Sequence, residues 1–123
     1  MWISEREWRR AEQARAAALA GEVTLAGDPA GVYLDGERRA LPVFGPGGYV
    51  WRPAVGQQVL VLKAGERGEA PCVAGAECGA QWDLKPGEVL IHSGEAAIRL
   101  KADGTVAVTG ALTVNGKSVM TAV

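Results

Sequence analysis

Residues 87–116 read GEVLIHSGEAAIRLKADGTVAVTGALTVNG, and this stretch decides the fold. Apolar residues recur at every second position in short runs, and the runs are separated by glycine-bearing turns. The pattern predicts strands at 88–92, 96–101, 105–109 and 111–115. One face of these strands carries eight aliphatic residues: Val89, Ile91, Ile98, Leu100, Val106, Val108, Leu112 and Val114.

The aliphatic face belongs to residues 85–123, a segment too short to shield it from water alone. Packing against identical copies would remove this aggregation hazard. We therefore expect an intertwined trimeric β-helix or β-prism over 85–123, with the eight aliphatic residues as the trimer core. The alternative is that these strands complete one single-chain barrel with the first half. The interior of such a barrel would have to be filled by bulky aromatic side chains, and no Phe, Tyr or Trp follows Lys85.

Residues 21–84 precede a Pro86-Gly87 step and predict a small OB-like β-barrel. Asp35-Gly36 indicates a tight hairpin turn, and residues 40–55 hold too many prolines and glycines for a long strand. The apolar run at 59–62 is typical of a buried strand, with 70–75 as its hairpin partner. The whole chain is thus predicted to be mainly β.

Residues 1–20 are predicted to form an N-terminal helical segment, with the helix over 4–20. Ser4 and Glu7 have the spacing of a capping box, an Ala-rich stretch follows, and Gly21 is placed to cap the end. The apolar stripe on this helix is narrow and favours packing on another part of the protein. We expect it to pack on the barrel of its own or a neighbouring chain and to help dock the assembly.

Composition narrows the classes of function. The chain has 123 residues, a net charge of -1 and a pI near 5.8, which argues against nucleic-acid binding. No apolar stretch is long enough for a signal peptide or a membrane span, so we expect a soluble protein assembled in the cytoplasm. In that compartment Cys72 and Cys78 are expected as reduced thiols, with a disulfide as the alternative.

The ordered set of segments resembles the baseplate assembly protein V group of Mu-like and P2-like contractile-tailed phages. The resemblance covers about Gly21 to the end of the chain. Its segments are RPAVGQQVLVL at 52–62, PCVAG at 71–75, LKPGEVLIHSG at 84–94, IRLKADGTVAV at 98–108 and LTVNGKSV at 112–119. The resemblance implies an OB-fold followed by a trimeric β-helical spike.

The resemblance also implies a mechanical function in the virion tail or baseplate. The homotrimer would close the tail tube, contact hub and tube proteins, and be driven through the outer membrane of the target cell. Many members of the family end in a His-x-His pair that binds iron at the apex, whereas this chain has only His92. We therefore expect no metal or cofactor, and an apolar tip formed by Val119, Met120 and Val123.

Two other classes of function were weighed against the spike. A ligand-binding OB module for oligonucleotides or saccharides would use aromatic and basic side chains, and the candidates are Arg38, Arg39, Tyr49, Trp51 and Arg52. An enzyme is not expected, because the sequence offers no catalytic triad, phosphate loop or metal cluster. A metal or anion site made of three copies of His92 is possible chemically, but its register predicts a solvated side chain.

Overall fold

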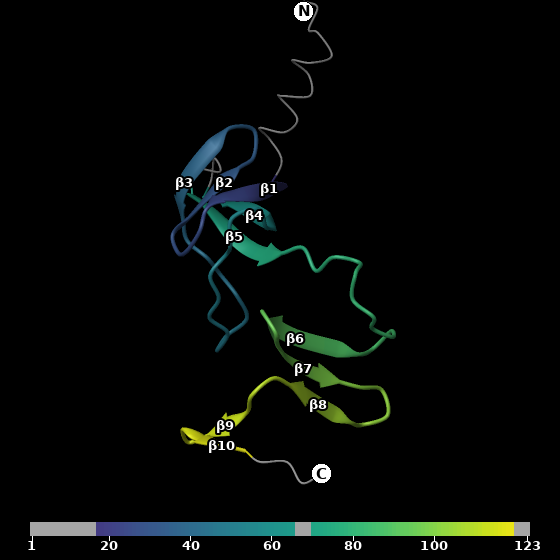
Figure 1. The fold of residues 1–123 in the computed structure, drawn as a ribbon. Helices are drawn as coiled ribbons and strands as arrows, with labels where there is room; N and C mark the ends of the chain where they lie inside the picture. Colours follow the sequence, from purple (N-terminus) through teal and green to yellow (C-terminus); the bar gives the residue numbers. More distant parts are fainter. Residues whose placement is uncertain (1–16, 66–69, 120–123) are drawn as a thin grey trace, which may run out of the picture. The chain divides into compact units, whose positions relative to one another are not determined.

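The computed structural model describes residues 17–65 and 70–119. The chain divides into two compact units, Met1–Cys78 (unit 1) and Gly79–Val123 (unit 2). Both units are built from antiparallel strands, so the mainly-β class is confirmed (Figure 1). Within the described ranges no helix is long and apolar enough to cross a membrane.

Unit 1 is a five-stranded antiparallel sheet in the order β3-β2-β1-β4-β5. Its strands are β1 (Ala18–Leu25), β2 (Ala30–Tyr33), β3 (Glu37–Leu41), β4 (Gln58–Ala64) and β5 (Ala70–Ala76). The two outer strands meet, because Val43 forms a parallel bridge with Val73 just after β3. Two backbone hydrogen bonds flank this bridge, Phe44 N to Val73 O at 2.8 Å and Val73 N to Pro42 O at 2.9 Å. The sheet therefore closes into a small barrel.

The interior of the barrel is filled by small aliphatic side chains. The residues buried there are Val23, Ala30, Val32, Leu41, Val59, Val61 and Val73. Within β1 and β4 the buried positions alternate with exposed ones, as a pleated strand requires. Trp51 covers one side of this core and is only half buried. The core is thus complete within unit 1.

The predicted N-terminal helix is wrong. The described residues contain no helix, and the last part of the predicted range, Ala18–Ala20, is the start of β1. Residues 4–16 lie outside the described residues. Ala18, Leu19 and Ala20 pair with residues 60–62 in the middle of β4, so tertiary pairing outweighs the helix propensity of alanine.

Gly21 is a strand residue and not a helix cap. A Cβ atom on it would lie 2.5 Å from Leu34 Cδ2 and 2.7 Å from the carbonyl oxygen of Tyr33. The glycine is required because β2 and the residue after it approach β1 closely at this point.

Unit 2 is a three-stranded meander followed by a hairpin. The meander has the order β6-β7-β8, with β6 (Val89–Ser93), β7 (Ala96–Leu100) and β8 (Val106–Thr109), and the hairpin pairs β9 (Thr113–Val114) with β10 (Lys117–Ser118). Asn115 and Gly116 both have positive φ, 51° and 78°, the geometry of a type I′ turn. Within the single chain these strands form an antiparallel meander and a hairpin. The intertwined trimeric β-helix or β-prism over 85–123 stays a prediction.

Candidate assembly face

Six aliphatic side chains form one face of the meander. Cross-strand pairing places them in two rows: Val89, Leu100 and Val106 in one, and Ile91, Ile98 and Val108 in the other. Residues directly opposite each other on neighbouring strands point to the same side of a sheet. We call this surface the aliphatic face. It brings together six of the eight residues that the sequence assigned to a trimer core.

The aliphatic face is open to solvent. Its six side chains are 41–61% exposed, and no residue of unit 2 is buried within 79–119. The opposite side of the sheet, which we call the mixed face, carries Leu90, His92, Ala97, Arg99, Ala107 and Thr109. Four of those are only half exposed. The more apolar side of the sheet is thus the more exposed one, which is the reverse of the usual burial in a soluble sheet.

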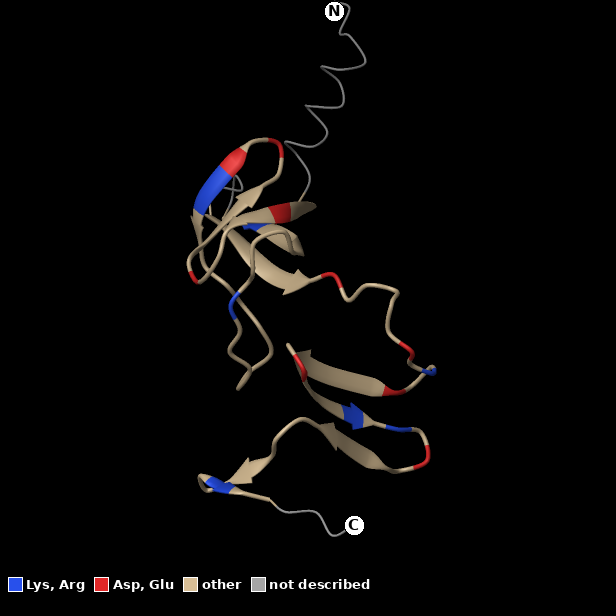
Figure 2. Ribbon diagram, viewed as in Figure 1, with Lys and Arg blue, Asp and Glu red and all other residues tan. Residues whose placement is uncertain are grey.

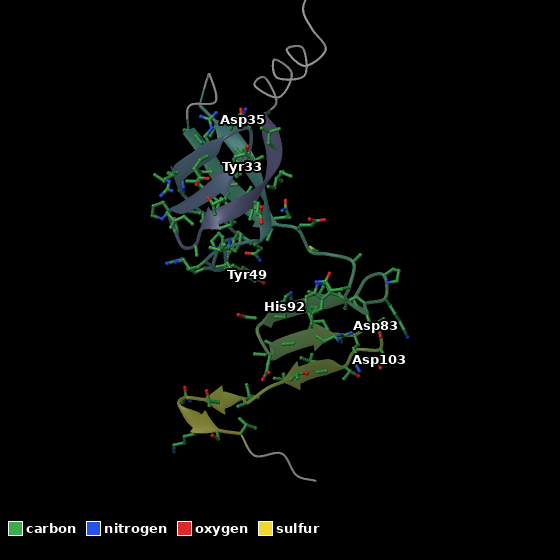
Figure 3. All side chains as sticks on the ribbon, turned by 45° about the horizontal axis from the view of Figure 1, so that its top comes forward. Tyr33, Asp35, Tyr49, Asp83, His92 and Asp103 are labelled. Atoms are coloured by element: carbon green, nitrogen blue, oxygen red, sulfur yellow. The ribbon has the colours of Figure 1, made fainter. Side chains whose placement is uncertain are left out.

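The segment before β6 contributes to this inversion, because it contacts two residues of the mixed face. The ring of Trp82 lies 4.2 Å from the ring of His92, centroid to centroid, at an angle of 43°. The carbonyl oxygen of Asp83 accepts a hydrogen bond from Arg99 Nη1. Figure 3 shows His92 and Asp83 within unit 2. The chain therefore shields part of the mixed face, whereas all six side chains of the aliphatic face are in the exposed class.

Charged side chains are nearly absent from the meander strands. The strands β6 and β8 contain no Lys, Arg, Asp or Glu, and β7 contains Arg99 alone. Figure 2 accordingly shows these strands mostly in tan. Arg99 belongs to the mixed face, so the aliphatic face carries no charge at all. A surface of this kind cannot attract an ion or a polar ligand, but it can pack against another apolar surface.

Glu88 fixes the start of the meander. Its carboxylate accepts hydrogen bonds from the backbone N–H of Lys85 and of Ala102, both at 3.0 Å, and so ties the chain before β6 to the turn after β7. These two bonds favour the ionised form and lower the pKa of Glu88, the larger effect coming from Ala102. The Asp103 carboxyl, whose pKa is lowered by hydrogen bonds from Thr105, adds a second acid-sensitive contact at the same turn.

Acidification is expected to weaken unit 2. Because the pKa of Glu88 is lowered in the folded chain, its stabilising effect is complete above the unfolded pKa and is lost as the pH falls through the folded one. The denaturant concentration at which half of the protein is unfolded should therefore decrease when the pH is lowered below about 4.5. In Glu88→Gln this decrease should be smaller. Glu95→Gln in the β6–β7 turn is the matched control and should behave as the wild type. An equal pH dependence in the Glu88 variant would contradict the role of this carboxylate.

The two remaining core residues and the first tip residue, Val119, lie outside the meander strands. Leu112 and Val114 belong to the β9–β10 hairpin, where Val119 N donates to Leu112 O at 2.8 Å. The pairing of Leu112 with Val119 and of Val114 with Lys117 places Leu112, Val114 and Val119 on one side of the hairpin. All three are 42–55% exposed. The tip residues Met120 and Val123 lie outside the described residues.

The candidate residues of a ligand-binding module do not form one surface. Arg38 pairs with Asp35 at 3.3 Å and Arg39 lies 3.8 Å from Glu37. Figure 3 places Asp35 and Tyr49 at opposite ends of the barrel. Arg52 Nη1 donates to the carbonyl oxygen of Trp51. Trp51 itself is a half-buried residue. Arg52 lies beside Trp51, but Arg38, which pairs with Asp35, lies at the other end of the barrel from Tyr49. The five candidates therefore do not form the continuous surface that single-stranded nucleic acid requires.

No metal-binding cluster of three or more His, Cys, Asp or Glu side chains occurs in the described parts of the chain. Cys72 is buried and Cys78 exposed, and no disulfide joins them. Comparison with the profiles of known protein families and with characterised protein sequences finds no match. The aliphatic face is accordingly the feature on which a functional argument rests.

Two surface features of unit 1 were missed at the sequence level. The run at 59–62 predicted a buried strand, but Leu60 and Leu62 point outward and are 46% and 41% exposed. The loop between β3 and β4 carries Phe44 and Val50 in exposed positions. The signal for the first feature was the lack of alternation in β4, which indicates a strand with apolar residues on both sides.

Proposed function

We propose that this chain is the subunit of a homotrimeric spike at the tip of a phage or phage-like tail, with a mechanical function and no catalytic reaction. The single observation that carries the proposal is the uncharged aliphatic face, 41–61% exposed in a unit without a buried residue from 79 to 119. A sheet of three strands with one open apolar side requires a partner for stability.

Identical copies are the simplest partner for such a face. Each of its six side chains is about half exposed, so completing their burial contributes on the order of 1 kcal/mol per side chain, or about 6 kcal/mol per chain, before the entropy of association. Cyclic symmetry lets every copy bury the same face in one closed interior. The resemblance of segments 84–94, 98–108 and 112–119 to tail spikes favours three copies.

A spike built in this way would resist bending. Backbone hydrogen bonds along the short strands and a common apolar interior would have to break together before the shaft could buckle. Within the tail, the partners of the trimer would be the hub and tube proteins of the baseplate, and its target the outer membrane of a cell. Stiffness is the property that such a role requires.

Solution mass tests this proposal directly. Light scattering on the untagged chain after size-exclusion chromatography should give a mass near three times 12.8 kDa. A monomer at micromolar concentration would contradict the proposal, because the aliphatic face would then be stable in water. A dimer would contradict the threefold arrangement, but the aliphatic face would remain the proposed interface between copies.

A further inference from the structure

The outer side of the barrel carries a second apolar surface. Ala18 pairs with Leu62 and Ala20 with Leu60, and all four side chains point away from the buried core. We call these four residues the barrel face. Beside it lies a hollow of about 270 Å³, lined by Ala20, Gln58, Val59, Leu60, Ala76 and Glu77. Most of the surface in this hollow is apolar.

A third exposed apolar feature is the loop between β3 and β4. Residues 42–51 include no charged residue. Phe44 and Tyr49 are 58% and 59% exposed, and Val50, at 83%, is the most exposed large hydrophobic side chain of the described residues. Phe44, Tyr49 and Val50 are called the apolar loop below. Aromatic side chains presented in this way often dominate the energy of a protein interface.

The apolar loop is held in one conformation before any partner binds. Trp51 Nε1 donates to the carbonyl oxygen of Phe44 at 3.0 Å, and Tyr49 N donates to Pro46 O at 2.9 Å. Gly45 packs against the Trp51 ring, where a Cβ atom would come within 3.3 Å. The loop thus loses little conformational entropy on binding, and such preorganisation strengthens an interface.

We infer that the apolar loop of one copy binds the barrel face of the next copy. The inference rests on the proposed trimer of unit 2, which brings three copies of unit 1 together. Residues 77–88 join β5 to β6, and a chain of this length spans at most about 40 Å. A short tether of this kind gives an effective concentration in the millimolar range. Another copy of the barrel is therefore the apolar surface most available to the loop.

Symmetry favours a contact between two different surfaces. In a closed threefold ring each subunit uses one patch toward the neighbour on one side and a second patch toward the other. Unit 1 offers two such patches, the apolar loop and the barrel face, and neither contains a charged side chain. The proposed trimer of the meander uses its own side chains, so the contact between barrels can be absent without loss of the trimer.

Thiol cross-linking of the full-length chain tests the inference. In a Cys78→Ser background, Val50→Cys and Leu60→Cys would be combined and treated with a short bismaleimide. Because tethering holds the two sites together, we expect about tenfold more covalent dimer and trimer on a denaturing gel than from either single variant. Val50→Cys with Arg39→Cys is the matched control, since Arg39 is exposed and lies on β3, outside the barrel face.

The outcomes separate the two proposals when the mass of each variant is measured in parallel. The contact is supported if the variants have the mass of a trimer and only the combination of Val50→Cys with Leu60→Cys is strongly cross-linked. Trimer mass without that cross-linking overturns the contact and leaves the spike intact. Cross-linking by Val50→Cys alone also overturns it, because the loop would then meet another loop. Monomer mass overturns the trimer and, with it, the basis of the contact.

Discussion

Val108→Asp is expected to convert the trimer into monomers. Val108 lies in the middle of β8 on the aliphatic face, paired with Ile98. The substitution removes apolar burial worth on the order of 1 kcal/mol in each chain, and about three times as much in the trimer. It also places three carboxylates in one apolar interior, where an unpaired charge is costly. Light scattering should show the loss of the threefold mass at micromolar concentration.

The neighbouring position provides the control for this prediction. Thr109 is exposed on the same strand but points to the mixed face, opposite Ala97. Thr109→Asp introduces the same charge one residue away, and the trimer should persist. Equal behaviour of the two variants, whether both dissociate or both remain trimers, would show that the aliphatic face is not the interface.

Gly21→Ala is expected to destabilise the barrel of unit 1. The new Cβ would lie 2.7 Å from the carbonyl oxygen of Tyr33, which is a backbone atom and cannot turn away. The strands must therefore shift, at a cost of roughly 1–3 kcal/mol for an overpacked site. Denaturant unfolding followed by tryptophan fluorescence should show a lower midpoint with an unchanged slope.

Gly36→Ala is the matched substitution for the barrel. No atom lies within 4 Å of the position that its Cβ would occupy, so the added methyl group meets open space. The unfolding midpoint should stay at the wild-type value or rise slightly, because alanine restricts the unfolded chain. If Gly21→Ala unfolds at the same denaturant concentration as Gly36→Ala, the close approach of β2 to β1 has no energetic weight.

The aliphatic face could be predicted from the sequence because its signal is local. Strict alternation fixes which side chains share a side of the sheet, and Ser93-Gly94 and Asp103-Gly104 mark the turns. The alternation does not say which side the chain itself covers. That depends on Trp82 and Asp83, whose contacts with His92 and Arg99 join positions 10 and 16 residues apart in the sequence.

The N-terminal boundary of the barrel could not be predicted from local signals. Ala18–Ala20 continue an Ala-rich pattern, and a glycine after such a pattern usually ends a helix. Here the partners of these residues are Leu60–Leu62, about forty positions later, and local propensity contains no information about them. The outward position of Leu60 and Leu62 has the same origin, because only the closed barrel defines an inside.

The cover that the Trp82–Asp83 segment gives to the mixed face determines how far association can proceed. A sheet that is adhesive on both sides can stack without end, layer on layer, as in a fibril. Here the Trp82–Asp83 segment contacts His92 and Arg99 on the mixed face, whereas the aliphatic face has no such contact and is the more adhesive side for neighbouring copies. In the proposed assembly, growth through this one side would stop at a small closed particle and would not continue as a filament.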